Sequence, residues 1–71
     1  MSKFIVIGTH RIYLRGNYAK KYNNLEQLEK AKAKEANRWN NVNPKLAEAI
    51  RNRPMIQWLS ESGAIFRKEE I

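Results

Sequence analysis

The sequence predicts a small α+β fold, in which a β-hairpin packs against two or three short helices in the order ββααα(β). Three observations predict it. An apolar, β-branched run precedes an alternating run of similar length, and a turn-forming glycine separates them. Two later segments carry apolar residues at helical spacing, each behind an asparagine suited to cap a helix. A short apolar segment near the end can add a third antiparallel strand to the hairpin.

The hairpin is predicted from two neighbouring runs. Lys3–Gly8 is apolar and β-branched, which is typical of a strand buried on both faces. Residues 8–10 form the expected turn. Arg11–Gly16 is the expected second strand. Residues 18–22 either extend it or form a loop, and the sequence does not decide between these.

Aliphatic residues alternate with polar and aromatic ones along the second strand, and this alternation determines which side chains share a face. Ile12 and Leu14 are aliphatic, whereas the residues around them are polar or aromatic. Because side chains on a strand alternate between its two faces, burial of Ile12 and Leu14 turns Arg11, Tyr13 and Arg15 outward together. We therefore expect one solvent-facing surface that carries two guanidinium groups and a tyrosine.

The first long helix begins after Asn24, because Asn24 and Gln27 have the spacing of a capping box. Its apolar stripe includes Leu28, Ala36 and Trp39. On the opposite side, three cations follow one another at intervals of four residues, and the asparagine-rich residues 40–43 interrupt the helix. The cations are Lys30, Lys34 and Arg38.

A second helix is expected after Asn43-Pro44, a cap followed by proline in the first turn. Pro54 ends or kinks it, and a third helical segment runs to Gly63. Residues 64–67 are the expected third strand, and residues 68–71 a frayed tail. The expected core consists of Phe4, Val6, Leu28, Trp39, Leu46 and Trp58. Either tryptophan could instead serve as an exposed interface anchor.

Length and composition limit what this chain can do. Its 71 residues suffice for one small domain, and a hydrophobic share of 42% is too high for a disordered tail. There is no cysteine for disulfides, and His10 is the only histidine in a chain without aspartate. No cofactor or metal is therefore expected. Small scaffolds usually add disulfides, a metal or a partner subunit, and because the first two are not expected, a homodimer is one alternative.

Positive charge is concentrated in the first half of the chain. Residues 1–38 hold nine of the fourteen Lys and Arg residues but three of the seven glutamates, a net charge of +6. Residues 39–71 carry five cations and four glutamates, a net charge of +1. Such asymmetry indicates a cationic surface for a polyanion or an acidic protein.

The candidate binding residues combine the outward side of the hairpin, the basic stretch after it and the helical cations. They are Arg11, Tyr13, Arg15, Tyr18, Lys20, Lys21, Lys30, Lys34 and Arg38. Guanidinium groups pair bidentately with phosphate, and tyrosines stack on bases. The leading hypothesis is a small nucleic-acid-binding accessory protein that contacts mainly phosphate, with little sequence specificity.

Two other hypotheses are considered, and only the first uses the same residues. The first is a small regulator or inhibitor that docks on an acidic surface of another protein, for example a phage-type factor directed against a host protein. In its small size, its eight asparagines and the absence of an enzyme signature, the chain resembles compact phage or mobile-element accessory proteins. The second is a DNA-binding helix-turn-helix over residues 44–62, although its last helix offers only Gln57 and Ser60 as base readers.

An enzyme is not expected, because no histidine, cysteine or paired carboxylates have the spacing of a catalytic site. No apolar run reaches the ~20 residues of a membrane span. Lack of cysteine and of an export signal fits the cytoplasm.

Overall fold

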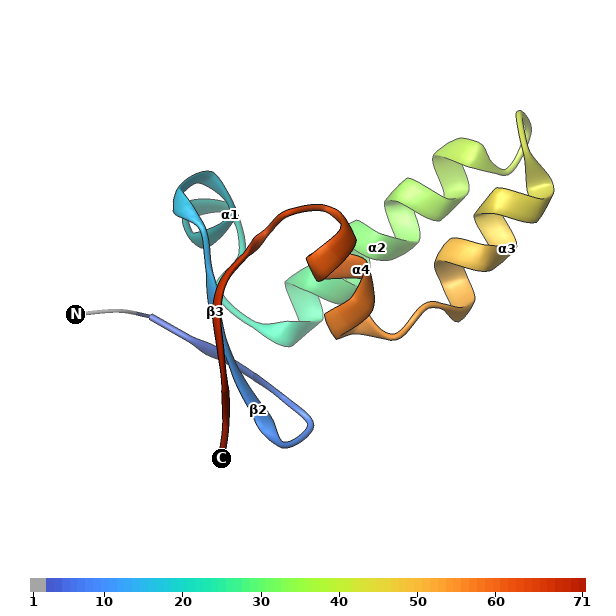
Figure 1. Cartoon of the computed structure of the whole chain (residues 1–71). Helices are drawn as coiled ribbons and strands as arrows, with labels where there is room; N and C mark the ends of the chain where they lie inside the picture. The colour runs from blue at the N-terminus through green and yellow to red at the C-terminus, as the bar shows by residue number, and fades with distance from the viewer. Residues whose placement is uncertain (1–2) are drawn as a thin grey trace.

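A computed structural model describes residues 3–71 as a three-stranded antiparallel sheet and four helices (Figure 1). The predicted α+β class and the order of its elements are confirmed, with one more helix than expected. The elements are β1 (Ile5–Ile7), β2 (His10–Leu14), α1 (Gly16–Lys21), α2 (Leu25–Trp39), α3 (Pro44–Asn52), α4 (Met55–Glu61) and β3 (Ile65–Glu70).

β1 and β2 form the predicted hairpin, with Ile7 opposite His10 across a two-residue turn. Gly8 has a φ of 62°, which glycine adopts without a steric cost, and glycine in the first turn position matches the twist of the strands. His10 lies in β2 and not in the turn. β1 pairs with one edge of β2 and β3 pairs with the other, so β2 is the central strand of the sheet.

β3 pairs with β2 over its whole length, from Ile65 opposite Leu14 to Glu70 opposite His10. The third strand is thus confirmed, but the prediction of a frayed tail is wrong. Residues 68–70 pair with β2, and the Ile71 amide donates to the Thr9 carbonyl at 2.8 Å. Backbone pairing holds these residues in the sheet although their side chains are mostly charged.

The core lies between one face of the sheet and the helices. Ile12 is fully buried, as is Leu28 of α2, and Trp58 and Leu59 of α4 are nearly so. The core as a whole contains Ile5, Ile7, Ile12, Leu14, Leu28, Ala36, Ala47, Ile50, Trp58, Leu59 and Ala64.

Phe4 and Val6 are not core residues, contrary to the prediction, because Ile5 and Ile7 take the inward positions of β1. Phe4 is 43% exposed and Val6 is 48% exposed. One face of β1 is therefore open, and the expectation of burial on both faces is wrong. Trp39 is half-buried and packs against the core from its edge.

The predicted caps are present. Asn24 Oδ1 accepts from the Gln27 amide at 2.9 Å, and Gln27 Oε1 accepts from the Asn23 amide at 2.6 Å. Asn43 Oδ1 accepts from the Leu46 amide at 3.2 Å. After α4, Gly63 has a φ of 72°, and the next amide donates back to the carbonyl of the last helical turn, which ends the helix as a Schellman motif.

The molecule is elongated, with extents of 41 × 22 × 19 Å. The antiparallel pair α2 and α3 projects away from the strands, which form the other end of the molecule (Figure 1). Residues 18–22, which the sequence left undecided, belong largely to α1, whose last turn closes when the Tyr22 amide donates to Tyr18. Within residues 3–71, no helix combines the length and apolarity that crossing a membrane requires.

Candidate nucleic-acid interface

The outward face of the sheet gathers aromatic and arginine side chains from all three strands or their flanks. Ile12 and Leu14 are buried as predicted, so the side chains that alternate with them point away from the helices. Tyr13 lies opposite Arg67 of β3, and Arg11 lies opposite Val6 of β1. Directly opposed residues share a face, so strand pairing brings these side chains together.

Phe4, Arg11, Tyr13 and Arg67 are linked by three contacts, and we call them the aromatic–arginine face. The Phe4 and Tyr13 rings lie 5.6 Å apart between centroids with a 53° tilt. The Arg11 guanidinium carbon is 5.3 Å from the Phe4 centroid, and that of Arg67 is 4.3 Å from the Tyr13 centroid. These distances allow cation–π attraction, which holds both guanidinium groups over the rings.

One carboxylate, that of Glu69, lies on the aromatic–arginine face. Glu69 is directly opposite Arg11 in the sheet, and its Oε2 lies 3.7 Å from Arg67 Nε in an exposed pair. Exposed pairs of this kind contribute about 0–1 kcal/mol, so a phosphate can compete for the guanidinium. Within residues 3–71, no carboxylate lies within 4.0 Å of the Arg11 guanidinium.

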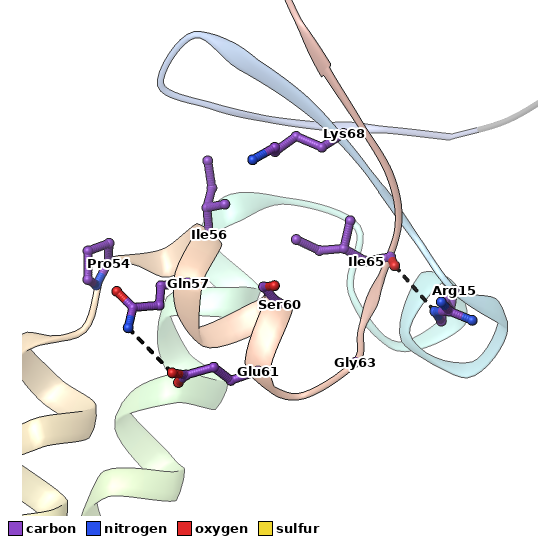
Figure 2. A pocket seen from close by; sticks show the side chains of 9 residues that line it. All are labelled: Arg15, Pro54, Ile56, Gln57, Ser60, Glu61, Gly63, Ile65 and Lys68. Atoms are coloured by element: carbon purple, nitrogen blue, oxygen red, sulfur yellow. Dashed lines mark hydrogen bonds between the residues drawn. The ribbon is translucent and has the colours of Figure 1, made fainter.

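Arg15 is exposed but lies apart from this face, at the start of α1. Its Nε donates to the Ile65 carbonyl at 3.2 Å, and its amide donates to the Ala64 carbonyl at 2.8 Å. Figure 2 shows Arg15 beside the first residues of β3, at the edge of an open pocket whose other cation is Lys68. The expected surface of Arg11, Tyr13 and Arg15 is therefore reduced to Arg11 and Tyr13.

Four other predicted residues meet in a second place. Tyr18 and Lys21 of α1 line a hollow of about 410 Å³ together with Lys34 and Arg38 of α2. Trp58, from α4, is also part of its lining. We call this the α1–α2 hollow.

The remaining two predicted cations stand outside both places. Lys20 is exposed on α1 and does not line the hollow. Lys30 is exposed on α2, where its Nζ lies 3.6 Å from Glu26 Oε1. Both side chains lie on solvent-exposed helix surfaces.

Sequence reasoning missed Phe4 and Arg67. Along β1, the two alternating sets of side chains are equally hydrophobic, and either set could face the core. The run itself therefore does not show which residues point outward. Arg67 was within the predicted third strand, but its register against Tyr13 depends on a bulge between Tyr13 and Leu14. Local sequence signals do not specify such a bulge.

Among residues 3–71, no three His, Cys, Asp or Glu side chains are grouped closely enough to hold a metal ion. In α4, the proposed recognition helix, Trp58 and Leu59 are buried, as expected for a helix that packs in the core. Comparison of the chain with protein-family models, with curated proteins and with solved structures finds no match.

Proposed function

We propose that the protein binds single-stranded nucleic acid through the aromatic–arginine face. The observation that supports the proposal is an open sheet face on which two aromatic rings lie beneath two guanidinium groups. Phe4 remains 43% exposed there. A partner that offers both flat rings and anions would cover both features.

Each component of the face matches one part of a nucleic-acid strand. Arginine pairs with phosphate oxygens through a planar fork of donors, and its plane can also stack on a base. Aromatic rings stack on unpaired bases regardless of base identity. In a duplex the bases are already stacked and paired, so the rings would gain nothing. We therefore expect a preference for single strands over duplexes, with low sequence specificity.

The first test is the salt dependence of binding to single-stranded oligonucleotides of about ten nucleotides, a length within the range of known single-strand sites. Fluorescence anisotropy gives the affinity at several salt concentrations. We expect Arg11→Gln/Arg67→Gln to lower the affinity about tenfold, because two charged contacts are lost. The slope of log K against log salt should become shallower by about 1.4, the value for two phosphates on a single strand.

The matched control is Lys30→Gln/Lys45→Gln, which removes the same charge from exposed sites on α2 and α3. Equal losses in both double variants would mean that only net charge matters, and this would contradict the proposed face. A protein partner captured stoichiometrically after nuclease treatment, together with no binding to any oligonucleotide, would favour docking on an acidic protein instead.

A further inference from the structure

A hollow lies where α1, α2 and α4 meet. The α1–α2 hollow is lined by side chains from these three helices, which are far apart in the sequence. Its volume of about 410 Å³ lies within the range of small-molecule sites. The Tyr18 hydroxyl donates to the Ser62 carbonyl at 3.4 Å, which ties α1 to the end of α4 across the hollow.

Apolar and aromatic side chains make up the inner part of the hollow. Trp58 is only 8% exposed and Leu59 only 1%, so both lie at its base. Tyr18 and Tyr22 are half-buried, and their rings are nearly parallel, with centroids 6.5 Å apart. A flat aromatic group entering the hollow would therefore meet ring surfaces.

The rim of the hollow is cationic. Lys21, Lys34 and Arg38 are exposed, and no carboxylate lies within 4.0 Å of them in the part of the chain that the structure describes. Glu35 is the one acid in the lining, and its Oε2 already accepts from Trp58 Nε1 at 2.8 Å. Three cations beside one engaged carboxylate leave an uncompensated positive charge, which suits a dianionic group.

We propose that the α1–α2 hollow binds a nucleotide, with its phosphate monoester on the cations of the rim and its base against the tyrosines. A phosphate monoester carries nearly two negative charges at neutral pH and has three acceptor oxygens, which suits a rim lined by three cations. The site does not depend on the aromatic–arginine face. Its nucleotide is either free in solution or the 5′-phosphorylated end of a strand.

The test is a titration with AMP at low salt, followed by the NMR signal of the Trp58 indole N–H. Comparison with Trp39→Phe assigns that signal, because the chain has two tryptophans. We expect a saturable shift in the wild type and about tenfold weaker binding in Lys21→Gln/Lys34→Gln. The control Lys20→Gln/Lys30→Gln removes the same charge from the same two helices outside the hollow and should bind AMP like the wild type.

Two further ligands decide whether both halves of the nucleotide matter. Adenosine lacks the phosphate and inorganic phosphate lacks the base, so each should bind at least tenfold more weakly than AMP. Equal binding of either one, or equal losses in the two lysine pairs, would overturn the proposal. Circular dichroism of each variant verifies that the fold is retained. If the double variant Lys21→Gln/Lys34→Gln does not fold, the single variant Lys34→Gln is tested in its place.

The two sources of the nucleotide are separated with oligonucleotides. If the 5′ end of a strand occupies the hollow, a 5′-phosphorylated oligonucleotide binds more tightly than its 5′-hydroxyl form, and Lys21→Gln/Lys34→Gln abolishes the difference. If free nucleotides occupy it, the two oligonucleotides bind equally while AMP still binds. Arg11→Gln/Arg67→Gln should leave AMP binding unchanged, so failure of either site is seen independently of the other.

Discussion

Complete burial of Ile12 decides where its two neighbours on β2 point. Its side chain lies among the helices, so Arg11 and Tyr13 must emerge on the opposite face. Their surroundings differ, however. Tyr13 is half-buried and contacts the Phe4 ring and the Arg67 guanidinium, whereas Arg11 is exposed over Phe4. Tyr13 contacts Phe4 and Arg67 directly, and Phe4 in turn contacts Arg11. Tyr13 therefore links the other three residues of the face.

Substitutions at Tyr13 separate stacking from general apolar contact. Tyr13→Leu retains an apolar side chain but removes the π surface. We expect its affinity for a single-stranded oligonucleotide to fall fivefold or more, since stacking on one base contributes about 1–3 kcal/mol. Tyr13→Phe retains the ring and should bind like the wild type. If Tyr13→Leu also binds like the wild type in fluorescence anisotropy, base stacking on this ring is ruled out.

At the scale of elements, the boundaries of α2, α3 and α4 were predictable from local chemistry, whereas α1 was not predicted. Asn24 and Asn43 each accept a hydrogen bond from an amide of the first helical turn, and Pro54 separates α3 from α4. Such signals act within a few residues, so a sequence contains them in full. The buried face of β2 was predictable for the same reason, because its aliphatic residues alternate with polar and aromatic ones.

Sheet pairing could not be predicted in the same way. The outward residues of β1, including Phe4, are as apolar as the inward ones, so hydrophobicity does not show which set faces the core. β3 lies about fifty residues from β2 in the sequence, and its charged second half looks like a solvated tail. Only backbone pairing with β2 makes it a strand, and that pairing places Arg67 on Tyr13. The α1–α2 hollow likewise depends on how three helices pack.

The cap of α2 makes a prediction at this scale. Asn24→Ala removes the acceptor for the Gln27 amide, and we expect it to lower the free energy of unfolding by about 1 kcal/mol. Urea unfolding followed by circular dichroism measures the change. Asn41→Ala, at an exposed position between α2 and α3, is the control and should have little effect. A similar loss in both variants would show that the Asn24 side chain does not stabilise the helix.

For the whole molecule, most of the positive charge is not neutralised internally. The described residues include all fourteen lysines and arginines, and four of these form ion pairs, which leaves ten without a carboxylate within 4.0 Å. The unpaired cations belong to an elongated molecule whose sheet end carries the aromatic–arginine face. A polyanion bound at that end would relieve repulsion among them, and this would be strongest at low salt.

NMR mapping with a single-stranded oligonucleotide tests the central claim most directly. Backbone amide signals are followed at low salt while the oligonucleotide is added. We predict that the largest shifts occur at Phe4, Arg11, Tyr13 and Arg67, with little change at Lys45 on the distant α3. Shifts confined to helix residues, or none at the sheet face while binding is observed, would contradict the account.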